Sequence, residues 1–354
     1  MAARLKPVSQ QVVVITGASS GNGLAIARLA ARRGAAVVLS ARNAAALSVI
    51  RDEIVAEGGR AACVVADVSS MEEVEAIAAT ATEAFGGFDS WVNNAAVGIY
   101  GSLEQVPLAD HRRVFDVNYF GTLHGSLVAA RHLRERGGGA IINVGSVLAD
   151  RAIVEQGPYS ATKHAVQALT DTLRMELERE RANVSVTLVK PGGCATPYPE
   201  HARNYMDVPP RIPPPLYHPE IIADAVVFAC ATPRRTLYIG SGTIASSLVS
   251  QVAPRLTDLV MEAVGTRVQQ RAADVQDSTK RDNLYEPRSD GKVCTDQHVM
   301  MRHHSLALQV QKLPKLGWIG LGVATALATG ARAIASRPKH SRELIGPGRG
   351  SHHE

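Results

Sequence analysis

Tyr159 and Lys163 stand four residues apart in a stretch whose apolar residues have helical spacing. Side chains four apart on a helix lie on the same face and can meet. A tyrosine of ordinary pKa, ~10, is a poor acid or base at neutral pH, and a neighbouring ammonium lowers that pKa because it stabilises the phenolate. The pair therefore predicts a proton-transferring residue, Tyr159, with Lys163 as its electrostatic partner.

A glycine-rich run, TGASSGNG from Thr16 to Gly23, follows a β-branched segment and precedes a helical one. In that context glycines let backbone N–H groups and a helix N-terminus approach a pyrophosphate, since a Cβ would block the approach. The run predicts a dinucleotide-binding turn. Its expected cofactor-binding residues are Gly17, Ser19, Ser20, Gly21, Asn22 and Gly23.

The second expected strand ends at Ser40-Ala41-Arg42, where an NAD-binding unit usually carries an acidic residue for the ribose hydroxyls. Without that carboxylate a 2′-phosphate meets no repulsion, and the Arg42 guanidinium offers it a fork of donors. The sequence thus favours NADP(H) over NAD(H). An ordinary surface arginine at the start of a helix is the alternative for Arg42.

The third expected strand ends at Asp67 and Val68, which we also expect at the cofactor. Asp67 either caps the following helix or accepts a hydrogen bond from the adenine amino group. The sequence leaves both roles open.

Short β-branched runs alternate with Ala-rich helical stretches from Gln11 to about Gly240. That alternation is typical of a parallel sheet covered by helices on both faces. We therefore expect an α/β fold, a Rossmann-like doubly wound parallel sheet of about seven strands, in an NADP-binding domain over residues 1–250. The expected strands lie in QVVVIT, AAVVLS, RAACVVAD, FDSWVNN, GAIINVGS, NVSVTLVK and TLYIG.

Residues 251–354 are expected to form a C-terminal extension, because from about Gly242 the pattern becomes irregular and shows no strand signal. Residues 316–331 carry no charge, but a membrane-spanning helix needs ~20 apolar residues and this run is shorter. Small residues at four-residue spacing within it suit close helix contacts in lipid. Two interpretations stay open: a helix that packs on the domain or on a second subunit, and membrane association.

The composition indicates a globular protein, since 45% of the residues are hydrophobic and 20% are charged. The formal net charge is +5, but arginines alternate with acidic residues from Arg174 to Arg181, which argues against a nucleic-acid partner. The four cysteines form no Cys-x-x-Cys pair, so we expect neither a metal site nor disulfides. The first ten residues lack the apolar run of a secretory signal, and we expect a cytoplasmic location.

The glycine run and the Tyr159/Lys163 pair belong to an ordered set of motifs. The set is TGASSGNG at 16–23, NNAA at 93–96, Asn118, Ser146 after IINVG, YSATK at 159–163 and PG at 191–192. Together these motifs resemble the classical short-chain dehydrogenase/reductase family. The extension with its apolar tail is more loosely similar to a bacterial subgroup of that family.

The resemblance implies a role for each matching catalytic residue. Tyr159 is the expected general acid/base, and Lys163 is expected to lower its pKa and hold the nicotinamide ribose. Ser146 is expected to hydrogen-bond the reacting oxygen, and Asn118 to keep a water in the proton relay behind the lysine.

Five further residues match cofactor-contacting positions of the family. Asn94 and Ala95 correspond to the stretch that supports the sheet and lines the adenosine ribose. Pro191, Gly192 and Thr196 correspond to the segment that passes the nicotinamide, where the threonine bonds the carboxamide. The family also implies a homodimer or homotetramer.

These observations predict an oxidoreductase that transfers a hydride between NADP(H) and a carbonyl or alcohol substrate. Val147, Leu148, Ala149, Val154 and Gln156, with a proline-rich loop from Cys194 to Pro219, suggest a hydrophobic substrate. The alternative is a non-catalytic NADP(H)-binding sensor or scaffold, which would not require the tyrosine. An extended nucleotide-sugar enzyme would need strand signals after Gly242, which are not seen.

Overall fold

The computed structural model describes residues 3–271, 282–288, 291–295, 297 and 300–313. The chain divides into a compact unit over residues 1–311 and a second over 312–354. Of the second unit only Lys312 and Leu313 are described, so the apolar segment at 316–331 lies outside the described residues. The division into a domain over 1–250 and an extension over 251–354 stays a prediction.

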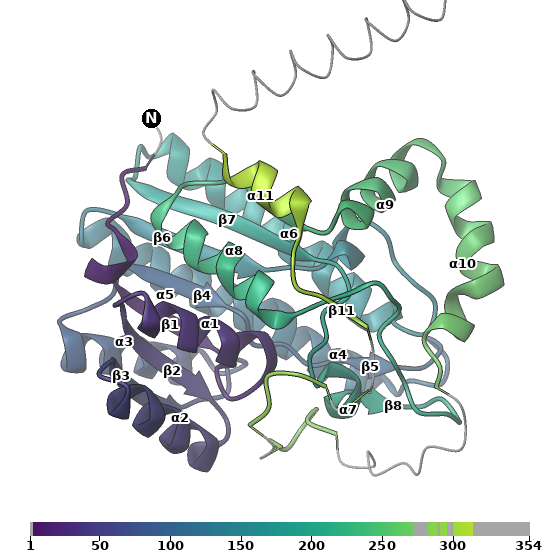
Figure 1. Ribbon diagram of the computed structural model, residues 1–354, viewed down its shortest axis with the longest axis horizontal. Helices are drawn as coiled ribbons and strands as arrows, with labels where there is room; N and C mark the ends of the chain where they lie inside the picture. The colour runs from purple at the N-terminus through teal and green to yellow at the C-terminus, as the bar shows by residue number, and fades with distance from the viewer. Residues whose placement is uncertain (1–2, 272–281, 289–290, 296, 298–299, 314–354) are drawn as a thin grey trace, which may run out of the picture. The chain divides into compact units, whose positions relative to one another are not determined.

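Seven parallel strands form the central sheet, in the order β10-β7-β6-β4-β1-β2-β3 (Figure 1). Each falls in one of the seven predicted segments, with β2 and β7 ending one residue beyond theirs, and the predicted doubly wound α/β fold is confirmed. Strand order reverses between β1 and β4, which is where such sheets open a ligand crevice at their carboxyl ends. The strands are β1 (Val12–Thr16), β2 (Ala36–Ala41), β3 (Arg60–Val65), β4 (Ser90–Asn93), β6 (Gly139–Val144), β7 (Val184–Pro191) and β10 (Thr236–Ile239).

Helices cover both faces of this sheet. Along β1, Val13 and Ile15 point to one helix layer, and Val12 and Val14 to the other, because successive strand side chains alternate. The first layer contains α1 (Gly21–Arg32), α2 (Ala44–Ala56) and α8 (Pro219–Ala231). The second contains α3 (Met71–Phe85), α4 (Leu108–Phe115), the π-helical turn η2 (Asp116–Phe120), α5 (Gly121–Glu135) and α6 (Gly157–Arg179).

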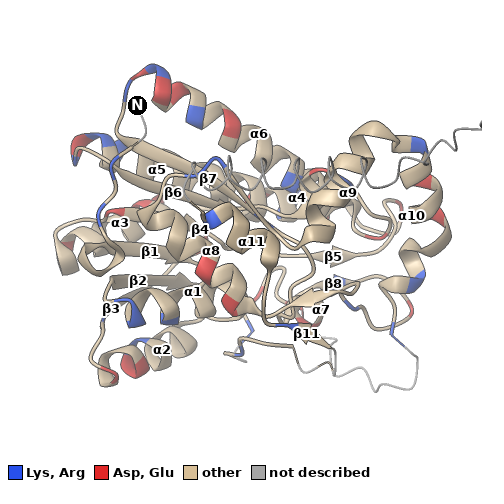
Figure 2. Cartoon of the chain, turned by 45° about the horizontal axis from the view of Figure 1, so that its top comes forward, with Lys and Arg blue, Asp and Glu red and all other residues tan. Residues whose placement is uncertain are grey.

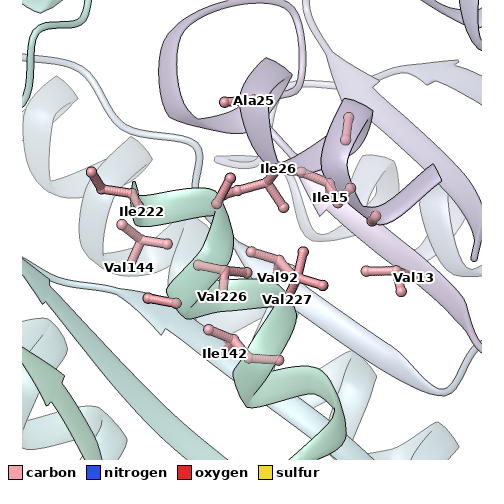
Figure 3. Packing of buried hydrophobic residues seen from close by; sticks show 14 of the residues in the cluster. Val13, Ile15, Ala25, Ile26, Val92, Ile142, Val144, Ile222, Val226 and Val227 are labelled. Atoms are coloured by element: carbon pink, nitrogen blue, oxygen red, sulfur yellow. The ribbon is translucent and has the colours of Figure 1, made fainter. Parts of the chain in front are cut away.

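The core of the first layer is aliphatic. Ile26 of α1 meets Val226 and Val227 of α8 above Ile15 and Ile142 of the sheet (Figure 3). Parallel strands buried on both faces require such continuous β-branched runs. This packing fixes where the carboxyl ends of the strands lie, and therefore where the loops that follow them lie.

The expectation of irregular chain after Gly242 is wrong for the described residues. Two helices follow the sheet, α9 (Ser241–Val252) and α10 (Pro254–Val268), and later come β11 (Met301–Arg302) and α11 (Leu306–Lys312). The buried positions of α9 are Thr243, Ser247 and Ser250. A helix that buries hydroxyls instead of an apolar stripe gives little hydrophobic periodicity, and a two-residue strand gives none.

The proline-rich segment forms short elements instead of a bare loop. They are α7 (Tyr198–His201), β8 (Arg203–Asn204), which pairs with β5 (Ile99–Tyr100), and β9 (Leu216–Tyr217), which pairs with β11.

Charged residues lie mainly on the outer helices, and basic and acidic residues are interspersed along α6 and α10 (Figure 2). The sheet beneath them is almost free of charge in this view. Within the described part of the chain, no helix has both the length and the apolar character needed to cross a membrane.

Candidate active site

A cavity of about 550 Å³ lies at the carboxyl ends of the strands, around the point where strand order reverses. Its volume is in the range of small-molecule and cofactor sites. All the predicted cofactor-binding residues line it, as do Ser146, Tyr159 and Lys163. The sheet therefore brings together motifs that are far apart in the sequence.

The glycine turn between β1 and α1 forms one wall of the cavity. Gly17 and Gly21 have positive φ angles of +66° and +54°, which side-chain-bearing residues rarely adopt. A Cβ on Gly23 would lie 2.0 Å from the carbonyl oxygen of Gly17. Because the turn is too tight for any side chain there, it presents backbone and the start of α1 to the cavity, which fits the pyrophosphate of a dinucleotide.

Asn94 braces this turn from the end of β4. Its Nδ2 donates to the carbonyl oxygens of Thr16 (2.9 Å) and Gly17 (3.2 Å), and its backbone N–H donates to Thr16 Oγ1 (3.0 Å). These bonds hold the glycine turn against β4. The adjacent Ala95 lines the cavity.

Ser146 and Tyr159 lie at the opposite end of the cavity. Ser146 follows β6 and begins the short helix η3 (Val147–Ala149), and Tyr159 lies in the first turn of α6. Both residues line the cavity. Burial raises the pKa of Tyr159 above its ordinary value, and the nearby Ser146 side chain acts in the opposite direction.

Lys163 lies one turn after Tyr159. Its Nζ is 5.5 Å from the centre of the Tyr159 ring and donates to the carbonyl oxygen of Val144 at 2.9 Å. Burial lowers the pKa of Lys163 to about 8. Desolvation is the largest effect on the pKa of both groups, and the lowering of the Tyr159 pKa by Lys163 stays a prediction.

Asn118 is fully buried in η2 and does not line the cavity. Its Oδ1 accepts from the Val97 N–H at 2.8 Å, and its Nδ2 donates to the Val97 carbonyl (3.0 Å) and to Thr162 Oγ1 (3.1 Å). The side chain thus ties the loop after β4 to α6, behind the catalytic turn. Its role in a proton relay stays a prediction.

The guanidinium of Arg42 points along the cavity wall. It donates to the carbonyl oxygens of Asn283 and Tyr285, the latter at 2.9 Å, and lies 3.8 Å from Asp67. The alternative of an ordinary surface arginine is therefore not supported. Asp67 accepts from Arg113 and from the Ser69 N–H. The capping alternative for Asp67 is wrong, because Ser70 Oγ caps α3.

The expected substrate wall is partly correct. Val147, Leu148 and Gln156 line the cavity, whereas Ala149 and Val154 do not. Residues of the proline-rich segment line the cavity as expected, and residues of α9, for which the sequence predicted no role, line it as well. They include Ile212, Pro213, Pro214, Pro215, Thr243 and Ser246.

Two tyrosines beside the catalytic one were missed. The Tyr198 ring lies 5.3 Å from the Tyr159 ring and 6.0 Å from the Tyr100 ring, centre to centre. A Cβ on Gly98 would lie 2.3 Å from the Tyr198 hydroxyl, so that glycine makes room for the ring. No motif marks either tyrosine, because α7 and β5 approach each other only in the folded chain.

Residues 283, 287 and 288 of the C-terminal region also line the cavity. No motif indicated them either. Across the described residues, no group of three or more His, Cys, Asp or Glu side chains could hold a metal ion.

The geometry of this site agrees with comparisons between this chain and known proteins. Residues 11–206 match the family model "short chain dehydrogenase". The chain belongs to the short-chain dehydrogenase family. The predicted resemblance is thus confirmed, and the chain is an oxidoreductase of this family.

Individual relatives agree with the family. An uncharacterized oxidoreductase, YxnA of Bacillus subtilis, is 47% identical over 263 residues, 74% of each chain. A short-chain dehydrogenase/reductase from Burkholderia phymatum in complex with NAD has a TM-score of 0.66 and 29% identity, covering 72% of this chain and 97% of that one. L-sorbose reductase from Gluconobacter frateurii, complexed with NADPH and L-sorbose, has a TM-score of 0.58 and 26% identity, covering 68% and 97%.

Proposed function

We propose that this short-chain dehydrogenase transfers a hydride between NADP(H) and a carbonyl or alcohol, with Tyr159 as general acid and base. The observation that carries the proposal is that Ser146, Tyr159 and Lys163 together line the cavity that begins at the glycine turn. A pure nucleotide-binding protein would need the turn but not these three residues.

Each residue then has a defined task. When bound, the nicotinamide supplies or accepts the hydride. In the reducing direction, the Tyr159 hydroxyl donates its proton to the substrate oxygen as negative charge develops there. Ser146 donates a second hydrogen bond to that oxygen. Because the pKa of Tyr159 is raised, the hydroxyl keeps its proton at neutral pH until the substrate oxygen takes it.

Two residues at the carboxyl end of β2 are the reason for proposing NADP(H) instead of NAD(H). Ala41 stands where a carboxylate would repel a 2′-phosphate, and Arg42 lines the cavity beside it. Relatives with known complexes include one with NAD and one with NADPH, so the preference rests on these residues of the chain itself.

A hydrophobic carbonyl compound is the proposed substrate class. Leu148, Ile153 and Ile212 line the cavity together with three consecutive prolines. Apolar walls with a few convergent polar groups bind such molecules.

The experiment measures cofactor binding and turnover separately. NADPH and NADH binding is followed by nicotinamide fluorescence, and turnover is measured with a panel of ketones and aldehydes. We expect Tyr159→Phe to bind NADPH as the wild type does and to lose ~10²–10⁴-fold in kcat. Tyr119→Phe, whose ring lies outside the cavity lining, is the matched control and should keep full activity.

Arg42→Ala should weaken NADPH binding more than NADH binding, because only NADPH carries the 2′-phosphate while Arg42 also holds the Asn283 backbone in the cavity wall. Tight NADPH binding without turnover of any compound would favour the sensor or scaffold. Binding of neither cofactor by the wild type would contradict the proposed function.

A further inference from the structure

The side-chain amide of Gln269, directly after α10, is completely buried and has hydrogen-bond partners on both sides. Its Nε2 donates to the carbonyl oxygens of Val154 (2.8 Å) and Gly265 (2.9 Å), and its Oε1 accepts from Gln156 Nε2 at 2.6 Å. A carbonyl oxygen can only accept, so the atom of Gln269 that faces the two carbonyls must be its nitrogen. The backbone around Gln269 therefore fixes the orientation of this amide.

The orientation of Gln269 in turn fixes that of Gln156, the buried residue directly before α6. The Gln269 oxygen needs a donor, so Gln156 must present its nitrogen there, and its own oxygen then faces Tyr198. The Tyr198 hydroxyl oxygen is 3.1 Å from that oxygen. Because the amide oxygen of Gln156 has no proton to give, the Tyr198 hydroxyl must be the donor in this bond.

Tyr198 can therefore offer a bound molecule an acceptor but no donor. A phenolic hydroxyl has one proton and can also accept, and this proton is used by Gln156. The hydroxyl lies only 2.3 Å from the position of a Cβ on Gly98. Gly98, Gln156 and Tyr198 all line the cavity, and Tyr198 is only partly buried. A molecule in the cavity can thus reach the Tyr198 side chain.

This acceptor belongs to the catalytic end of the cavity. The Tyr198 ring lies 5.3 Å from the Tyr159 ring, edge to face. Tyr100, whose ring is 6.0 Å from that of Tyr198, also lines the cavity, and its hydroxyl has no hydrogen-bond partner among the described residues. Buried polar groups usually have a partner. Two hydroxyls beside Tyr159 thus retain hydrogen-bonding capacity that the described part of the chain does not use.

We propose that Tyr198 selects substrates that carry a hydroxyl or N–H group close to the reacting carbon, because such a group can donate to its oxygen. The inference deepens the proposed function and rests on it, since the reacting oxygen must bond to Tyr159. An apolar carbonyl compound with one neighbouring donor fits both this acceptor and the apolar walls. An ether oxygen at the same place would face Tyr198 acceptor to acceptor, and such a substrate is disfavoured.

The test uses the full chain and pairs of ketones in which a hydroxyl replaces a methyl group at successive positions from the carbonyl carbon. In at least one pair the wild type should have the higher kcat/KM for the hydroxy ketone, by about fivefold. Tyr198→Phe keeps the ring and removes the acceptor, so this ratio should fall by about fivefold while NADPH affinity is unchanged. Comparing variants cancels the intrinsic reactivity of each ketone. Tyr119→Phe, outside the cavity lining, is the control and should keep the wild-type ratio.

Gln156→Met tests the direction of the hydrogen bond. It removes the acceptor that takes the Tyr198 proton, so the hydroxyl becomes free to donate. Ketones with a methoxy group in place of the hydroxyl should then gain in kcat/KM relative to the wild type, whereas Tyr198→Phe should give no such gain. Thermal unfolding checks that both variants are folded.

Three results would overturn the proposal: a wild type that prefers the methyl ketone in every pair, an unchanged ratio in Tyr198→Phe, or no methoxy gain in folded Gln156→Met. Tight NADPH binding by the wild type without turnover of any ketone would instead reject the proposed function.

Discussion

The Lys163 amine is buried against the Val144 carbonyl, and its pKa of about 8 lies below that of a lysine in an unfolded chain. Between these two pKa values the unfolded chain holds a proton that the folded chain has released. The stabilising effect of the neutral amine is therefore complete above the unfolded pKa and is lost as pH falls to about 8.

We expect wild-type stability to rise relative to Lys163→Met between pH 8 and about 10, by roughly 1–3 kcal/mol. Urea unfolding of both proteins at the two pH values measures the difference, and other titrating groups cancel in the comparison. If the two proteins changed in parallel with pH, Lys163 would not have the lowered pKa.

Tyr100 provides a second test at the residue scale. Its side chain is completely buried, and its hydroxyl has no hydrogen-bond partner among the described residues. A buried unpaired hydroxyl costs about 1–3 kcal/mol, so Tyr100→Phe should be as stable as the wild type or more stable by urea unfolding.

Tyr205→Phe is the matched control for Tyr100→Phe. The Tyr205 hydroxyl donates to Asp110, and loss of a bond to a charged group should cost about 1.5–3 kcal/mol. Equal destabilisation of the two variants would show that the Tyr100 hydroxyl has a partner after all.

Individual site residues differ in how far the sequence revealed them. Gly23 and Tyr159 were predicted because their chemistry imposes a local pattern, a side-chain-free turn and a pair spaced by one helical turn. Tyr198 and Arg288 were not predicted, since each reaches the cavity from a segment without periodicity, and only long-range hydrogen bonds place those segments.

At the scale of elements, a buried ion pair holds the segment between Ser146 and Tyr159, and α9 adds a hydrogen bond to the same carboxylate. Lys190 and Asp150 are 2.5 Å apart, with side chains 3% and 5% exposed, and Ser247 of α9 donates to the same carboxylate. The C-terminal helices therefore contribute to the position of the catalytic segment.

Asp150→Ala should destabilise the protein by about 3–5 kcal/mol, because it leaves the Lys190 ammonium buried without its partner. Asp258→Ala is the control: Asp258 pairs with Arg151, and its side chain is 40% exposed. That variant should cost at most about 1 kcal/mol. Similar urea midpoints for the two variants would contradict the importance assigned to the buried pair.

The elements also show where prediction from sequence stops. The strands were predicted because five of them, β1, β2, β4, β6 and β7, are buried at every residue, and that requirement is visible as a continuous apolar run. The helices α9 and α10 were missed because α9 buries hydroxyls and α10 buries only Thr257 and Gly265. Their packing depends on specific polar bonds, which a hydrophobic pattern does not encode.

For the whole molecule, the end of the described chain returns to the sheet. Leu308 of α11 is completely buried in the core of the first helix layer, and Gln311 bonds to the backbone N–H and carbonyl of Tyr238 at 2.9 and 2.8 Å. The edge strand β10 is thereby covered, which protects its unpaired backbone groups.

Leu308→Ala should cost about 2–5 kcal/mol in free energy of unfolding, as for other buried leucines. Leu306→Ala on the same helix is the control, since Leu306 is 82% exposed and its truncation should cost under about 0.5 kcal/mol. Thermal or urea unfolding separates them. Equal stability of both variants would mean that α11 does not pack on the core.

The bond between the Gly21 N–H and the Lys292 carbonyl joins two residues that the ribosome adds far apart in time, the glycine first. Chains emerge from the N-terminus, and domains fold as their residues become available. The glycine turn and most of the sheet can thus assemble first, while the outer wall of the cavity is still being translated. A growing chain that stops before residue 282 carries every catalytic residue but an open nucleotide site.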